Sequence, residues 1–265
     1  MQLRRTLMFC LAVTGVVMAA DSPFAGKWKL NTAKSKFTGL TTNYEALPTG
    51  EMQVTSEGQS SKFQVDGKEY PATFGAGATW KQIDPATWET TYRLNGVVLS
   101  VETTHISADG KTMTVTAKGT KPNGEAFNDS TTLQRTSGGP GLTGKWKSTA
   151  VKSSTEMWEI TPNGDDGLTM KIVDFNAVCT LKFDGKDYPA TGPTIPKNFT
   201  LAVRKTGARS LEMTEKMDGR VVSADTFTVS ADGKTLTDEA VPAGTTEKIK
   251  AVYDKVGAAS LEAVK

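Results

Sequence analysis

Apolar and polar residues alternate with a period of two along much of the chain. The stretch "WETTYRL" (88–94) places Trp88 and Tyr92 on one phase, and "LEMTEKM" (211–217) alternates in the same way. Alternation of this kind predicts strands that bury one face. Asn-Gly follows the first stretch and Asp-Gly follows the second. These dipeptides tolerate the positive φ of a tight turn, so each pair predicts a β-hairpin.

Further Asp-Gly-Lys segments mark two more turns in each half of the chain. They occur before Tyr70, before Tyr188, at 108–111 and at 231–234. Because Asp and Gly are the residues that such turns require, we interpret their aspartates as structural rather than as paired catalytic carboxylates. These aspartates are Asp66, Asp109, Asp184 and Asp232.

The turns belong to a long internal repeat. "VDGKEYPAT" (65–73) returns as "FDGKDYPAT" (183–191), and "FAGKWKLNTAKS" (24–35) returns as "LTGKWKSTAVKS" (142–153). Further blocks recur in the same order at nearly constant spacing, which indicates duplication. The copies span about 115 residues each, which is enough for separate hydrophobic cores.

The repeat predicts two tandem domains of one fold. The expected boundaries are 24–135 for the first copy and 142–255 for the second. Between them "TSGGPG" (136–141) has the composition of a linker. The tail at 256–265 contains "AASLEAVK", which is the only segment with a helical pattern.

Many short strands joined by hairpins predict an all-β fold with little helix. We expect each copy to close into a small antiparallel up-and-down β-barrel, since closure removes exposed strand edges and leaves room for one small ligand. A two-sheet sandwich is the alternative.

The first twenty residues predict a cleaved signal peptide. Arg4 and Arg5 precede the apolar run "TLMFCLAVTGVVM", and small residues near Ala19 and Ala20 suit a signal peptidase. An uncleaved anchor is the alternative, although the run is short for a membrane span. We therefore expect residues 1–20 to be removed and the protein to be exported, to the periplasm or outside the cell.

Charge and cysteine content exclude several classes of function. The chain has 31 Lys and Arg residues against 29 Asp and Glu residues, and both charged residues of the expected leader are Arg. The remaining chain is close to neutral, so we expect neither nucleic acid nor an anionic membrane surface as a partner. No later stretch approaches the length of a membrane span, so we expect no integral membrane segment in the mature chain. Cys179 is the only cysteine outside the leader, so no internal disulfide is possible. Its place on an apolar strand phase predicts a buried, unreactive thiol.

Catalytic and metal-binding motifs are missing. His105 is the single histidine and Thr228 replaces it in the second copy, so we interpret it as a surface residue at a strand end. One histidine and one cysteine exclude the usual zinc sites, and no hydrolase or phosphate-binding motif occurs. We expect no metal, no cofactor and no enzymatic activity, with a carboxylate-only hydrolase as the alternative.

The Trp-containing segments carry a resemblance to a known family. "FAGKWKLN" resembles the first strand of lipocalins and fatty-acid-binding proteins, in which a Gly-x-Trp follows an aromatic residue. The end of the second copy is similar to the last four strands of a fatty-acid-binding protein. The resemblance implies a calycin-like barrel with Trp28 and Trp146 at its closed end. Ala251 and Thr131 stand where intracellular fatty-acid binders place a carboxylate-binding Arg, which argues against a fatty-acid ligand.

Several side chains are candidates for lining a ligand cavity. Five are aromatic residues on apolar strand phases, and Glu215 places a carboxylate on an apolar phase where the first copy has Tyr92. A buried carboxylate is costly unless it is paired, and such exceptions cluster at functional sites. The candidates are Phe63, Trp88, Tyr92, Phe183, Phe199 and Glu215.

Together these features predict an exported protein that binds a small apolar or amphipathic molecule in lipocalin-like barrels. The alternative is a structural or interaction protein of the cell envelope whose barrels are fully packed. An internal cavity would separate the two.

Overall fold

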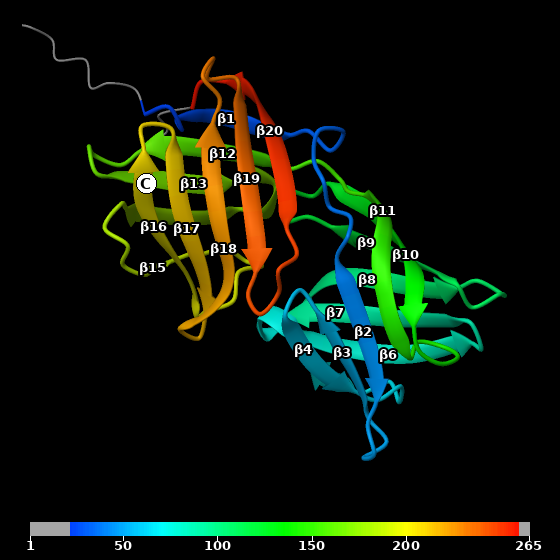
Figure 1. The fold of residues 1–265 in the computed structure, drawn as a ribbon. Coiled ribbons are helices and arrows are strands. Elements are labelled where there is room, and N and C mark those ends of the chain that lie inside the picture. The colour runs from blue at the N-terminus through cyan, green and yellow to red at the C-terminus, as the bar shows by residue number, and fades with distance from the viewer. Residues whose placement is uncertain (1–21, 260–265) are drawn as a thin grey trace, which may run out of the picture.

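A computed structural model describes residues 22–259, of which almost all ordered structure is strand (Figure 1). The protein is 62% strand and 3% helix, and its strands form two nearly closed, antiparallel up-and-down barrels. The predicted all-β fold is confirmed. The expected signal peptide (1–20) and most of the tail with its expected helix lie outside the described residues.

One barrel, which we call barrel B, is built from a continuous stretch of chain. Its sheet has the order β4-β3-β2-β11-β10-β9-β8-β7-β6-β5, and a short 3-10 helix, η1, precedes β6. The elements are β2 Thr41–Ala46, β3 Met52–Ser56, β4 Gln59–Phe63, β5 Glu69–Pro71, η1 Thr73–Gly75, β6 Gly77–Asp84, β7 Thr87–Leu94, β8 Val97–Ile106, β9 Thr112–Thr120, β10 Ala126–Ser137 and β11 Gly144–Lys152.

The other barrel, barrel A, combines the first strand of the chain with the last nine. Its sheet has the order β14-β13-β12-β1-β20-β19-β18-β17-β16-β15. The elements are β1 Gly26–Leu30, β12 Met157–Pro162, β13 Gly167–Ile172, η2 Val173–Phe175, β14 Ala177–Lys182, β15 Tyr188–Pro189, β16 Phe199–Gly207, β17 Ser210–Met217, β18 Arg220–Val229, β19 Thr235–Pro242 and β20 Ile249–Gly257.

The two sequence repeats therefore exchange their first strands. The strand β1 belongs to the first repeat but pairs with β12 and β20, so that Trp28 lies opposite Trp158 and Lys255. The strand β11 belongs to the second repeat but pairs with β10 and β2. In Figure 1 the dark blue β1 lies among the strands of barrel A, while β2 runs in the other barrel. The barrels thus differ in composition from the repeat units predicted at 24–135 and 142–255.

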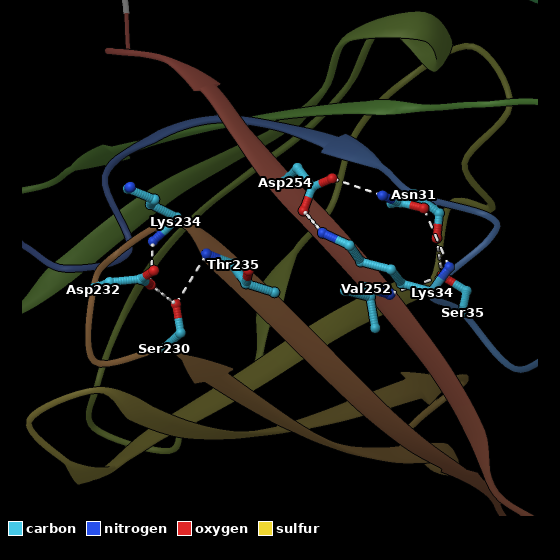
Figure 2. Close-up of polar contacts among 9 residues, drawn as sticks. All are labelled: Asn31, Lys34, Ser35, Ser230, Asp232, Lys234, Thr235, Val252 and Asp254. Atoms are coloured by element: carbon cyan, nitrogen blue, oxygen red, sulfur yellow. Dashed lines mark hydrogen bonds and ion pairs between the residues drawn. The ribbon is translucent and has the colours of Figure 1, made fainter.

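The segment that leaves β1 is fixed to the last strand of barrel A (Figure 2). Asp254 on β20 accepts hydrogen bonds from Asn31 Nδ2 and Lys34 Nζ, each at 2.7 Å. The backbone N–H of Val252 donates to Ser35 Oγ at 2.9 Å. These contacts keep the chain along β20 before it crosses to barrel B at β2.

The stretch 136–141, predicted as a linker, connects β10 to β11 within barrel B. Its flanking strands pair directly, with Arg135 opposite Trp146. The Arg135 guanidinium donates to the carbonyl oxygens of Gly139, Gly141 and Thr143 and lies 4.0 Å from the centre of the Trp146 ring. The glycine-rich composition therefore supplies carbonyl groups that surround one cation.

The tryptophans of the two Gly-x-Trp segments occupy matching places in the two barrels. Trp28 in barrel A and Trp146 in barrel B are both 0% exposed. Each indole N–H donates to the carbonyl oxygen four residues earlier, at Phe24 and at Leu142, over 2.8 Å. Lys255 lies over the Trp28 ring as Arg135 lies over the Trp146 ring. Both barrels thus close around the same indole arrangement, each with a strand taken from the other repeat.

The Asp-Gly turns have the structural role that the sequence predicted. The side chain of Asp66 accepts the backbone N–H of Lys68 at 3.0 Å, and Asp184 accepts that of Lys186 at 3.0 Å. Asp232 accepts the N–H of Lys234, and Ser230 joins the same turn (Figure 2). The glycine that follows each aspartate has positive φ. The aspartates of the repeated nine-residue segment therefore hold the turn, as the sequence predicted.

The barrels touch through loops at their ends. The hairpin turn at Gly58 of barrel B approaches Ala243 of barrel A so closely that a Cβ at Gly58 would lie 1.7 Å from the Ala243 carbonyl oxygen. Glu247 accepts hydrogen bonds from the backbone N–H and the hydroxyl of Thr41, and Lys121 Nζ donates to Thr155 O at 2.6 Å. These contacts join the two barrels.

Candidate functional site

A cavity of about 410 Å³, which we call the barrel cavity, opens into barrel B and is also bordered by Phe37 and Leu40 of the crossing segment and by Ile249 of barrel A. Inward-facing residues of several strands line it, among them Tyr44 on β2, Tyr92 on β7, Val115 on β9 and Leu133 on β10. Its only charged lining residues are Glu57 and Glu102. Its wall combines apolar side chains, such as Val115 and Leu133, with the hydroxyl groups of Thr131 and Ser148. A wall of this mixed character suits a molecule that has both apolar and polar parts.

Glu102 on β8 is the most unusual residue of this cavity. Among residues 22–259 its carboxyl group has no hydrogen-bond or ion-pair partner. Desolvation by the surrounding protein disfavours the charged form and raises the pKa of Glu102 to about 7. Glu102 is partly exposed where it borders the cavity, so its carboxyl group is unpaired but accessible to a ligand. Carboxyl groups with a raised pKa are concentrated at functional sites.

Glu102 also connects the barrel cavity to two neighbouring spaces. A side cavity of about 400 Å³ shares Glu57, Tyr92 and Glu102 with the barrel cavity. An inter-barrel cavity of about 810 Å³ shares Ser100 and Glu102 with the side cavity and extends to Ile195 of barrel A. Glu102 therefore lies where all three spaces meet, between the interior of barrel B and the gap between the barrels.

The residues next to Glu102 are polar but uncharged. Burial, and secondarily the Glu102 carboxylate, raises the pKa of the Tyr44 and Tyr92 hydroxyls far above 10, so both stay neutral. Thr90 lies opposite Glu102 in the β7–β8 register. Its side chain is buried, and its hydroxyl has no hydrogen-bond partner within the part of the chain that the structure describes. Of these neighbours, Tyr44 and Tyr92 line the barrel cavity with Glu102, whereas Thr90 lines none of the three spaces.

Barrel A carries an acid at the equivalent position, but there the protein itself supplies the partners. Asp225 pairs across the ladder with Met213 as Glu102 pairs with Thr90. Asp225 accepts a hydrogen bond from Ser223 Oγ at 2.5 Å and shares a further hydrogen bond with Glu215. Desolvation raises the pKa of both carboxyls, so the two acids share a proton near neutral pH.

Two more acids extend this network in barrel A. Desolvation, with the nearby charges of Asp225 and Glu215, raises the pKa of Asp238 to about 8. Glu156 accepts hydrogen bonds from the Tyr253 hydroxyl at 2.7 Å and from Trp158 Nε1 at 2.9 Å. The interior of barrel A is therefore occupied by acids and aromatic rings, and among its acids Asp238 keeps one buried oxygen without a hydrogen-bond partner in the described part of the chain. No group of three or more His, Cys, Asp or Glu side chains among residues 22–259 is arranged to hold a metal ion.

The sequence-predicted candidates divide between the barrels. In barrel B, Tyr92 lines the cavity beside Glu102. Phe63 is buried and stacks on Trp80 with ring centres 4.0 Å apart. Trp88 is also buried, and it lines a separate surface depression next to Ala86.

The remaining candidates lie in barrel A. Phe183 and Phe199 are partly buried against its core, and Lys205 lies over the Phe183 ring. Glu215 points to the interior acid network, where Asp225 is its partner. The structure therefore brings only Tyr92 to the barrel cavity, and a ligand contact at the other five stays a prediction.

Sequence reasoning missed Glu102, although a signal was present. The repeat aligns Glu102 with Asp225, so both copies have an acid at the same inward-facing place. The inward phase of β8 is polar and consists of Ser100, Glu102 and Thr104, so in the sequence it resembles an exposed strand face. Leu99, on the opposite phase, lines the inter-barrel cavity. Comparison of the two copies at inward positions could have identified the residue.

The two isolated reactive residues take no part in these cavities. His105 is exposed on β8, with Nδ1 3.0 Å from Thr87 Oγ1. Cys179 is buried, as predicted, and desolvation raises the pKa of its thiol to about 11. Within 22–259, no helix has the length and apolar character needed to cross a membrane.

Comparisons of the chain with protein-family models, with curated proteins and with solved structures find no match.

Proposed function

We propose that this protein is exported and binds a small amphipathic molecule, with the barrel cavity of barrel B as the binding site. The observation that carries the proposal is the cavity of about 410 Å³ that holds two carboxyl groups, Glu57 and Glu102, without partners among the described residues. An unpaired carboxyl group costs stability, and a polar group of a bound molecule would offset that cost.

The contrast between the barrels supports the same proposal. Both copies have an inward-facing acid at one position, but only barrel A surrounds it with hydrogen-bonding side chains. We infer that barrel A gives the pair its rigidity and that barrel B receives the ligand. The Gly-x-Trp arrangement and the up-and-down barrels are consistent with a lipocalin-like or calycin-like ancestry, and the expected leader at 1–20 is consistent with export to the periplasm or beyond.

Val115→Phe tests the binding site directly. The larger side chain would fill part of the barrel cavity, so we expect the affinity for the neutral, environment-sensitive dye Nile red to fall by at least about 10-fold. The measurement is a fluorescence titration of the dye with the purified protein.

Val256→Phe is the matched control, because Val256 is 53% exposed and lies far from the cavity lining. This variant should bind the dye as the unsubstituted protein does. Equal dye binding by all three proteins would contradict the proposed site, since the dye would then bind elsewhere on the surface.

A further inference from the structure

The unpaired carboxyl group of Glu102 bears on the chemistry of the ligand. Two carboxyl groups, Glu57 and Glu102, line both the barrel cavity and the side cavity, and no Lys or Arg lines either one. Neither carboxyl has a hydrogen-bond or ion-pair partner among the described residues. The chamber therefore presents negative charge or protonated acids, and no fixed cation, to anything that enters it.

Among the described residues, Lys121 is the one Lys or Arg that lines the inter-barrel cavity, and its ammonium group already has partners. Lys121 Nζ donates to the Thr155 carbonyl oxygen at 2.6 Å and lies 3.9 Å from Glu125. The other acids of this cavity also have partners: Asp129 accepts the N–H and the hydroxyl of Ser154, and Glu156 accepts two hydrogen bonds. Glu102 and Glu57 are the acids left to bind a ligand.

We propose that the ligand carries a protonated amine, which Glu102 binds while an apolar chain or ring fills the barrel cavity. This inference rests on the proposed function and specifies its substrate class as an amphipathic organic cation. The ammonium group would pair with the Glu102 carboxylate, and the Tyr92 hydroxyl, which lines the same cavity, offers a further acceptor. Charge-assisted hydrogen bonds of this kind are the strong ones in a desolvated site.

The geometry also explains why an anionic ligand would be disfavoured. A carboxylate in the barrel cavity would face Glu57 and Glu102 with no cation to compensate, and like charges in a desolvated site repel strongly. The fatty-acid class, which needs a cation at its head group, does not fit this lining.

Binding of an amine should depend on pH because the Glu102 carboxyl titrates near neutrality. Its pKa is about 7 in the free protein, raised by desolvation. Tyr44 and Tyr92 stay neutral in this range, while Glu57, whose pKa burial also raises, faces the same chamber. The cation binds the ionised carboxylate, so affinity should rise as pH increases through about 7 and fall by about 10-fold for each unit below it.

The experiment compares octylamine, 1-octanol and octanoate, which share one chain and differ in the head group. Each compound is titrated into the complex of Nile red with the protein that lacks residues 1–20, and the displacement of the dye is measured at about pH 6 and about pH 8. We expect octylamine to compete at least about 10-fold better than either of the others at the higher pH, and to lose that advantage at the lower pH.

Glu102→Gln removes the charge with little change in shape. In this variant octylamine should lose its advantage and its pH dependence, while 1-octanol and Nile red should bind as before, which also shows that the variant is folded. Glu212→Gln, on the exposed outer face of β17 in barrel A, is the matched control and should leave every affinity unchanged.

The outcomes separate this inference from the proposed function. If 1-octanol or octanoate competes as well as octylamine and Glu102→Gln changes nothing, the cavity binds small molecules but the amine assignment is overturned. If none of the three compounds competes and Val115→Phe leaves dye binding intact, both proposals are overturned.

Discussion

Glu215→Gln is expected to stabilise the protein at mildly alkaline pH while changing little at mildly acidic pH. The folded-state pKa of Glu215 and Asp225 is raised by desolvation, and that of Asp238 is raised to about 8. The folded protein therefore binds more protons than the unfolded chain, whose carboxyls titrate near pH 4. The free energy of unfolding then falls as pH rises from about 4 to about 8, by on the order of 2–4 kcal/mol in all.

The substitution removes one acid from this network and keeps a hydrogen-bonding side chain next to Asp225. We expect a gain of about 1–3 kcal/mol in the free energy of unfolding near pH 8.5 and little change near pH 5. Urea unfolding at both pH values measures it. Glu212→Gln on the exposed face of the same strand is the control and should be neutral. Equal effects at both pH values, or a loss of stability at the higher pH, would show that Glu215 is not a proton-sharing buried acid.

Trp28→Ala is expected to weaken barrel A, and Trp146→Ala to weaken barrel B. Both indoles are 0% exposed, so each truncation should cost about 3–5 kcal/mol. Because the first strands are exchanged, Trp28→Ala destabilises the barrel built mainly from the second repeat, and Trp146→Ala destabilises the barrel built mainly from the first. Hydrogen exchange measured by mass spectrometry should show faster exchange in β12 and β20 for the first variant, and in β2 and β10 for the second.

The two variants control for one another, since they differ only in which barrel holds the indole. Trp28→Phe and Trp146→Phe repeat the comparison with smaller losses of stability if the alanine variants do not fold. Faster exchange in β2 and β10 of a Trp28 variant would contradict the exchanged topology, because it would place β1 in the barrel of its own repeat.

Much of the fold could be predicted because its signals are local. Asn95–Gly96 and Asp218–Gly219 form tight hairpins with positive φ at both residues, as their composition requires. Alternation then sets which side of each strand is buried. The aspartate–backbone hydrogen bonds of the repeated turns are formed within a few residues, so distant parts of the chain do not alter them.

The exchange of β1 and β11 could not be predicted, because the two strands are nearly interchangeable. "GKWK" begins both, and each tryptophan makes the same hydrogen bond and meets a cation over its ring. Either strand would therefore satisfy either barrel. The choice depends on nonlocal contacts such as Asp254 with Asn31 and Lys34, which alternation and turn residues do not report (Figure 2).

The candidate site was predicted only in part for a related reason. Tyr92 lies on the apolar phase of its strand and could be found by alternation. Glu102 lies on a polar phase, and the inward side of β8 becomes clear only when β7 pairs with it and the second copy is compared. A polar functional residue inside a barrel is hard to identify from the sequence while it is unknown which face of its strand points inward.

We expect barrel B to hold a small molecule when the protein is produced in its own host. Native mass spectrometry of the protein purified from its own host, followed by denaturing extraction, tests it most directly. We predict a bound species that is lost on denaturation, whose mass and positive-ion spectrum identify an organic amine, and that is absent from the Val115→Phe protein. A protein with no bound species in either form, and with no mass shift after exposure to an amine panel, would contradict the account.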